Sequence, residues 1–105
     1  MPATATRSDQ EIVFLAAGDC GPVQDETCTF PISHYSELIR PVLARADLKV
    51  VNCMRTYSTR AVQHELAPQV GQPVAMADIF THGRFDAVTL ANNHSYDSGP
   101  DAMLD

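Results

Sequence analysis

The hydrophobic positions of the chain form three short runs, separated by polar segments and by stretches with helical spacing. The runs cover residues 11–17, 48–53 and 86–91. Their length and their content of β-branched side chains predict three buried β-strands. The first strand is expected to break sharply at Gly18 and Asp19, where turn-forming residues follow the apolar run.

Residues 34–46 carry apolar side chains at the spacing of one helix face. This pattern predicts an amphipathic helix with Ser33 as its N-cap. Pro41 lies inside the pattern. A proline at such a position removes a backbone hydrogen bond and clashes with the preceding turn, so we expect the helix to kink or to split.

A second, shorter helix is predicted over residues 74–82, with Pro73 before it and Gly83 after it. A third helix is expected from Asp101 onward. The resulting order, β-α-β-α-β-α, predicts an α/β fold with a parallel sheet and right-handed crossovers. Strands this apolar need helices on both faces, and the last helix meets the chain end. We therefore expect the N-terminal part of a larger α/β sandwich, completed by further chain or by another subunit.

The acidic composition narrows the possible functions. The chain has 105 residues and a formal charge of −6 at pH 7, which argues against nucleic-acid binding because phosphate contacts need basic patches. No apolar stretch is long enough for a membrane span, and residues 1–10 form a polar lead-in without the apolar core of a signal peptide. The three cysteines, Cys20, Cys28 and Cys53, lack CxxC spacing and predict no disulfide framework, so a cytoplasmic location is expected.

Polar side chains follow each of the three predicted strands. Asp19 follows the first and Asn52 ends the second, while Asn93, His94 and Asp97 come after the third. The carboxyl ends of parallel strands meet at one edge of the sheet, where ligands bind in open α/β folds. Carboxylate, amide oxygen and imidazole all bind divalent cations. An Asn-His pair alone is better explained as a polar turn that satisfies backbone groups, but three similar strand ends favour a binding site.

Three segments at these strand ends resemble a known family. They are residues 13–19 (VFLAAGD), 46–52 (ADLKVVN) and 85–99 (FDAVTLANNHSYDSG). The chain resembles the bacterial capsule and poly-γ-glutamate biosynthesis protein CapA family, which is similar in fold to calcineurin-like metallophosphoesterases. The last segment is the most specific, because an Ala-Asn-Asn-His turn followed by Asp and Gly is the hallmark of that family. The resemblance implies that residues 11–105 form the N-terminal part of the family domain.

The resemblance also implies roles for individual residues. Asp19, Asn93 and His94 match metal-binding positions for manganese, iron or zinc. His94 matches the histidine that contacts the scissile phosphate or protonates the leaving group, so it is also a catalytic candidate. Asp97 is expected to orient His94 or to brace the turn. Together these matches imply a metal-dependent hydrolase of the phosphoesterase type.

One position departs from the family pattern. The family has Asn-x-Glu after the second strand, whereas this chain reads Asn52-Cys53-Met54. A neutral thioether cannot replace a carboxylate for a hard cation, so metal binding is expected to be weak or absent. A non-catalytic binding or accessory domain that keeps the fold therefore stays open as the alternative. Either function suits an anionic small molecule or polymer, for which Arg55 and Arg60 in the next loop are candidate contacts if they are not merely solvated.

Overall fold

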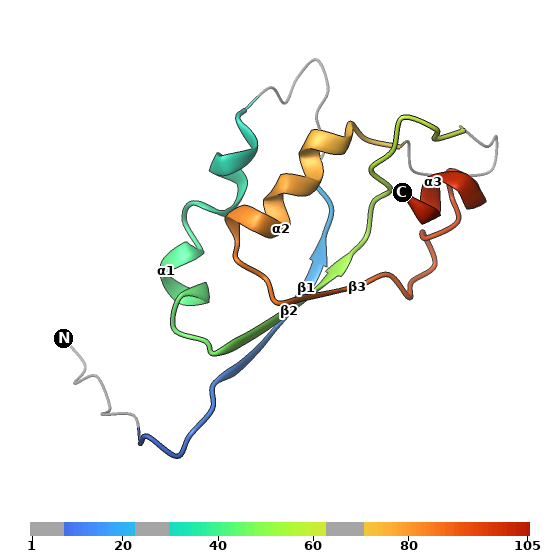
Figure 1. The fold of residues 1–105 in the computed structure, drawn as a ribbon. Coiled ribbons are helices and arrows are strands. Elements are labelled where there is room, and N and C mark those ends of the chain that lie inside the picture. The colour runs from blue at the N-terminus through green and yellow to red at the C-terminus, as the bar shows by residue number, and fades with distance from the viewer. Residues whose placement is uncertain (1–7, 23–29, 63–70) are drawn as a thin grey trace.

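Three parallel strands form a sheet in the order β1–β2–β3 (Figure 1). They are β1 (Phe14–Cys20), β2 (Leu48–Cys53) and β3 (Ala87–Thr89). The structure is a computed structural model that describes residues 8–22, 30–62 and 71–105. Both strand pairs are parallel, which confirms the predicted parallel α/β sheet. Most of the predicted lead-in, residues 1–7, lies outside the described residues.

The connections between the strands are helical, as the sequence pattern predicts. The first holds a 3₁₀ helix, η1 (Ile32–Ser36), and the short α1 (Arg40–Leu43). The second holds η2 (Val74–Ala77), which continues into α2 (Asp78–His82), and α3 (Pro100–Leu104) follows β3. The order β-α-β-α-β-α is therefore confirmed. No helix in these parts of the chain is long and apolar enough to cross a membrane.

Two strand boundaries differ from the prediction. The first strand was expected over residues 11–17 but covers Phe14–Cys20, so Gly18 and Asp19 continue the strand instead of breaking it. The strand accommodates them because its register with β2 shifts by one residue between Ala16 and Asp19, as in a β-bulge. The third strand is shorter than the predicted 86–91, since only Ala87–Thr89 pair with β2.

The predicted helix over residues 34–46 is split, and Pro41 lies in the first turn of α1. A proline is tolerated there because the amide it lacks has no partner within the helix. The prediction of Ser33 as an N-cap is wrong. Ser33 lies within η1, which begins after Pro31, and its carbonyl accepts a hydrogen bond from the Arg40 guanidinium.

Two aspartates fix the start of the neighbouring strands. Asp47 precedes β2, and its carboxylate accepts a hydrogen bond of 2.8 Å from the Val13 amide while its own amide donates to the Val13 carbonyl. Asp86 precedes β3 and makes the same two-way contact with the backbone of Lys49, also at 2.8 Å through the carboxylate. Each aspartate therefore sets the register of its strand against the previous one.

The helices cover one side of the sheet and leave much of the other side open. In Figure 1, η1, α1 and α2 lie on the same side of the strands, and α2 packs against η1. The small core between them contains Leu43, Val51, Met76 and Ile79. In the described parts of the chain the other face has no such cover, and its completion by further chain or another subunit stays a prediction.

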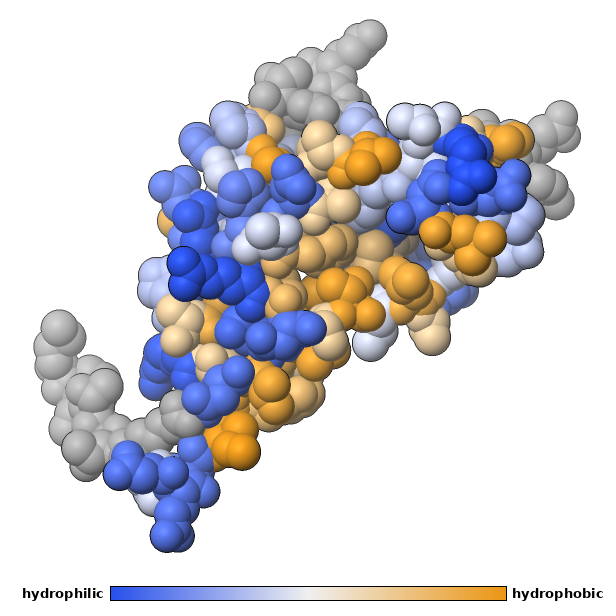
Figure 2. Space-filling view, in the orientation of Figure 1, coloured by the Kyte–Doolittle hydropathy of each residue, from blue (hydrophilic) through white to orange (hydrophobic). Residues whose placement is uncertain are grey.

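The strands are consequently more exposed than predicted. All three residues of β3 are exposed, so the prediction of a buried third strand is wrong for the described chain. Figure 2 shows hydrophobic residues gathered in a band over the strand side of the molecule, away from α1. Large apolar side chains left exposed on or next to the strands are Val13, Phe14, Leu48, Val88 and Leu90.

Candidate functional site

The irregularity in β1 decides which side chain faces the end of the central strand. Ala16 pairs with Val50, so a regular strand would place Gly18 opposite Asn52. The one-residue shift places Asp19 there instead. Bulges re-aim side chains in this way and are common beside functional sites. The shift therefore brings a carboxylate to the carboxyl edge of the sheet.

The amide of Asn52 connects all three strands. Its Nδ2 donates a hydrogen bond of 2.6 Å to Oδ1 of Asp19 on β1. Its Oδ1 accepts hydrogen bonds from Thr89 Oγ1 at 3.0 Å and from Asn92 Nδ2 at 3.1 Å. Thr89 is the register partner of Asn52 on β3. A single half-buried side chain thus joins Asp19 to the turn that follows the third strand.

Asn92 holds that turn in place. Its Nδ2 also donates to the Cys53 carbonyl at 2.7 Å, and its Oδ1 accepts a hydrogen bond of 2.9 Å from the His94 amide. The Ser95 hydroxyl donates to the Leu90 carbonyl, which closes the same turn from the other side. Both polar atoms of the Asn92 side chain are therefore occupied by hydrogen bonds within the protein. Because one of these bonds is to the His94 amide, Asn92 helps to orient His94.

His94 and Asp97 form a hydrogen-bonded pair. His94 Nδ1 lies 2.7 Å from Asp97 Oδ2, and both side chains are largely buried. An ionised carboxylate only accepts hydrogen bonds, so Nδ1 must carry a proton, which leaves Nε2 as the atom that exchanges one. This geometry is consistent with the predicted orientation of His94 by Asp97. The backbone of the turn is held separately, through the hydrogen bond between Asn92 and the His94 amide.

The predicted site residues fall into two groups. Asp19 and Asn52 lie together on the sheet, and His94 and Asp97 lie together on the turn. Asn93 is exposed, and its Nδ2 is 3.5 Å from His94 Nε2. Thr89 and Asn92 have structural roles that the sequence pattern did not predict. Thr89 could have been found from strand register, because it occupies the position beside Asn52 in the next strand.

The described residues do not by themselves fit a metal centre. Within residues 8–22, 30–62 and 71–105, no three His, Cys, Asp or Glu side chains are grouped to hold a metal ion. One oxygen of Asp19 accepts from Asn52, and the hydrogen bonds that link Asp19 to His94 pass through Asn52 and Asn92. The metal-binding role of Asp19, Asn93 and His94 therefore stays a prediction.

Two cysteines lie beside this site. Cys20 and Cys53 are register partners at the ends of β1 and β2, and both thiols are free. Burial raises the pKa of each thiol above its usual value. Both side chains therefore stay neutral near pH 7, which makes them poor nucleophiles. Cys28 lies outside the described residues.

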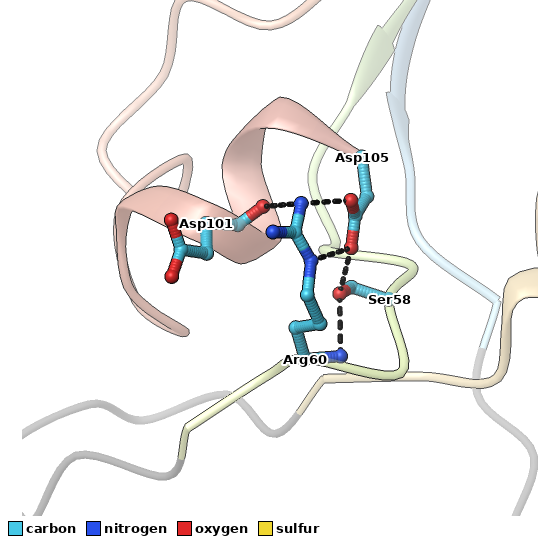
Figure 3. A network of polar contacts seen from close by, with 4 residues as sticks. All are labelled: Ser58, Arg60, Asp101 and Asp105. Atoms are coloured by element: carbon cyan, nitrogen blue, oxygen red, sulfur yellow. Dashed lines mark hydrogen bonds and ion pairs between the residues drawn. The ribbon is translucent and has the colours of Figure 1, made fainter.

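A polar network joins the loop after β2 to α3 (Figure 3). The Arg60 guanidinium binds both carboxylate oxygens of Asp105 and the carbonyl of Asp101, and the Ser58 hydroxyl donates to Asp105 at 2.5 Å. The Arg60 amide donates back to Ser58 Oγ at 2.8 Å. Arg60 is therefore engaged within the protein, which removes it from the two candidate contacts for an anionic ligand and leaves Arg55.

Comparison with models of protein families identifies a family for this chain. A family model described as "Bacterial capsule synthesis protein PGA_cap" matches residues 6–105, which is nearly the whole chain. This match confirms the predicted resemblance to capsule synthesis proteins and covers every strand-end residue described above. A search of curated proteins finds no significant match.

We expect Asn52→Ala to lower the free energy of unfolding by about 1–3 kcal/mol, because it leaves the partners of a half-buried amide unsatisfied. Asn93→Ala is the matched control and should change stability by less than about 0.5 kcal/mol, since Asn93 is exposed. Urea denaturation followed by circular dichroism measures both. Equal effects of the two changes would contradict the central role given to Asn52.

The network around Asp105 should depend on pH. Hydrogen bonds from Arg60 and then Ser58 lower the pKa of Asp105 from 3.8 to about 2. A carboxylate with a lowered pKa in the folded state stabilises the fold above its usual pKa, and that contribution is lost as the pH falls toward 2. The Arg60 Hε resonance should therefore move between pH 4 and pH 2 in NMR spectra.

Two variants control this pH experiment. Asp105→Asn should abolish the transition of Arg60, whereas Asp101→Asn should keep it, because the hydrogen bond from Arg60 to Asp101 is to its backbone carbonyl and the Asp101 charge has the smallest effect on Arg60. An Arg60 resonance that moves identically in all three proteins would show that Asp105 is not the titrating group.

Proposed function

Because the chain belongs to the PGA_cap family of bacterial capsule synthesis proteins, we propose that its strand-end residues bind an anionic phosphoester and transfer a proton to it. The observation that carries the proposal is the His94–Asp97 pair, with 2.7 Å between Nδ1 and Oδ2, at the carboxyl edge of a parallel sheet. In this proposal the chain provides one part of a hydrolytic site of the phosphoesterase type.

His94 acts as the general acid. Asp97 holds Nδ1 in its protonated form, so the proton that reaches the substrate comes from Nε2. An oxygen leaving from phosphorus becomes an alcohol when it accepts this proton, which avoids an unstable alkoxide. Asp97 is a positioning residue, because it acts on the substrate only through the orientation and tautomer of His94.

Binding of the anion falls to residues beside the dyad. Arg55 lies two residues after the last residue of β2, and Asn93 presents an exposed amide next to His94 Nε2. A guanidinium and an amide N–H both donate to phosphate oxygens. The metal implied by the resemblance, whether manganese, iron or zinc, would add water activation and charge neutralisation when bound. Of the three predicted ligands, Asp19 and Asn93 would hold it, because His94 donates through Nδ1 to Asp97 and keeps Nε2 for the proton transfer.

A non-catalytic binding or accessory domain is the second candidate. Met54 favours it, because the resemblance implies a glutamate at this position, and a neutral thioether is a poor ligand for a hard cation. In this alternative the same strand ends recognise an anionic polymer without cleaving it. The exposed strand side chains also support the prediction that further chain or a second copy completes the fold.

We expect His94→Ala to lower the turnover of an aryl phosphoester such as 4-nitrophenyl phosphate by about 10²–10⁴-fold, the usual contribution of a general acid. Asp97→Asn should lower it less, because the imidazole remains. The matched control is His34→Ala, which removes an exposed histidine on η1. Turnover is measured spectrophotometrically with manganese added, and thermal unfolding checks that each variant folds.

Two outcomes separate the candidates. Turnover that is unchanged in His94→Ala would contradict the catalytic proposal outright. Absent turnover together with binding of poly-γ-glutamate that His94→Ala leaves intact would favour the accessory domain.

Replacing Met54 by glutamate should strengthen metal binding, because it places an anionic oxygen at the end of β2. We expect calorimetry to show weak or no binding of Mn²⁺ to the natural sequence and measurable binding to Met54→Glu. Leu38→Glu adds the same charge at an exposed position between η1 and α1 and should give no gain. Tight binding to the natural sequence with no change in Met54→Glu would mean that Met54 does not occupy the glutamate position.

A further inference from the structure

A cavity of about 290 Å³ lies at the carboxyl ends of β2 and β3, between these strands, α2 and α3. Its wall is mostly apolar and includes Met54, Val74, Phe80, Val88, Leu90 and Met103. His94 and Ser95 stand in the same wall. The proposed proton donor therefore borders an apolar space. Ligand cavities combine apolar walls with a few polar groups in this way.

Polar contacts hold the walls of this cavity apart. The network of Ser58, Arg60 and Asp105 ties the loop after β2 to α3, and Asp105 itself lines the cavity. Tyr57 lines it from the same loop, bridges to Gln72 through backbone pairing, and packs edge-on against Phe80 with ring centroids 6.1 Å apart. Apolar walls that were free to move would close on one another. In this protein the walls belong to the loop after β2, to α3 and to the segment at Gln72, and hydrogen bonds between these segments set the distance between the walls.

The charges in the wall indicate the sign of the ligand. Arg55 lines the cavity, and its Nε is buried without a hydrogen-bond partner. Asp105, the acidic group of the wall, is already neutralised by Arg60. The groups that remain for a ligand are therefore Arg55 and His94, both suited to an anionic oxygen.

We propose that this cavity binds the hydrocarbon part of a phosphoester whose anionic group lies at His94 and Arg55. The inference rests on the proposed function and adds the class of substrate: a phosphate ester of a short alkyl chain or a single ring, rather than of a fully polar alcohol. The size supports a small group, because about 290 Å³ lies just below the range of about 300–1,000 Å³ for ligand pockets.

The test compares three probes on the full chain: hexyl phosphate, inorganic phosphate and 1-hexanol. Binding is followed by NMR through the methyl groups of Met54, Val88, Leu90 and Met103. We expect hexyl phosphate to bind at least about tenfold more tightly than inorganic phosphate, because its chain leaves water for an apolar wall. 1-Hexanol should shift the same methyl resonances, but at a higher ligand concentration than hexyl phosphate.

Leu90→Ser should remove most of the preference for hexyl phosphate, since Leu90 lines the cavity and is exposed enough for the fold to survive. The matched control, Leu38→Ser, changes a leucine that is 93% exposed and does not line the cavity. Equal affinity for hexyl phosphate and inorganic phosphate would overturn the inference. Methyl shifts that follow protein concentration instead of ligand would also overturn it, because a second copy would then fill the cavity.

The same titrations separate this inference from the proposed function. If His94→Ala weakens phosphate binding but the hydrocarbon adds nothing, only the apolar subsite fails. If hexanol binds but His94→Ala leaves the affinity for both phosphates unchanged, the proposed function fails and with it the assignment of a phosphoester.

Discussion

The site depends on one amide, the side chain of Asn52 at the end of the central strand. An amide can donate and accept at the same time, and Asn52 uses both abilities across the sheet: it donates to Asp19 and accepts from Thr89 and Asn92. A carboxylate at this position would repel Asp19, and an apolar side chain would leave its partners unsatisfied. Position 52 therefore requires a side chain that can both donate and accept hydrogen bonds, and this requirement matters more than the size of the side chain.

The two parts of the site, Asp19 on the sheet and His94 on the turn, are held by different kinds of structure. Asp19 is fixed by strand pairing and by Asn52, so its position follows the sheet. His94 lies on a turn of non-repetitive structure and is positioned by Asn92 and Asp97. A site built on a turn can adjust to its ligand, whereas the sheet supplies a fixed reference point.

Much of the fold could be predicted from sequence because it rests on local patterns. The three apolar runs gave the parallel strands, and the fixed φ of Pro41 gave the split of the first helix. The register shift in β1 could not be predicted, because it is defined by how β1 pairs with Val50 and Asn52 on the neighbouring strand, and this pairing is not visible in the sequence of β1 itself. Hydrophobic composition predicted strands that need cover on both faces, but composition alone does not show what covers the exposed β3.

The candidate site was predicted in outline but not in detail. Three polar strand ends pointed to one edge of the sheet, and spacing placed Asp97 within reach of His94. The neighbouring amides Asn92 and Asn93 look alike in sequence, yet one is bound on both sides and the other is exposed. Side-chain direction in a turn depends on its backbone angles, so adjacent residues of one type can differ completely in role.

The paired aspartates at the strand starts have a consequence for how the sheet assembles. Asp47 binds the backbone of Val13 through its carboxylate and its amide, and Asp86 binds the backbone of Lys49 in the same way. Asp86 also forms an ion pair of 3.6 Å with the Lys49 ammonium. Each β-α-β unit thus closes with a contact between positions about one connection apart in the chain, where the entropy of loop closure is modest. Each pair of neighbouring strands thus has its own alignment contact, so the loss of the Asp86 carboxylate would leave the contact between Asp47 and Val13 in place.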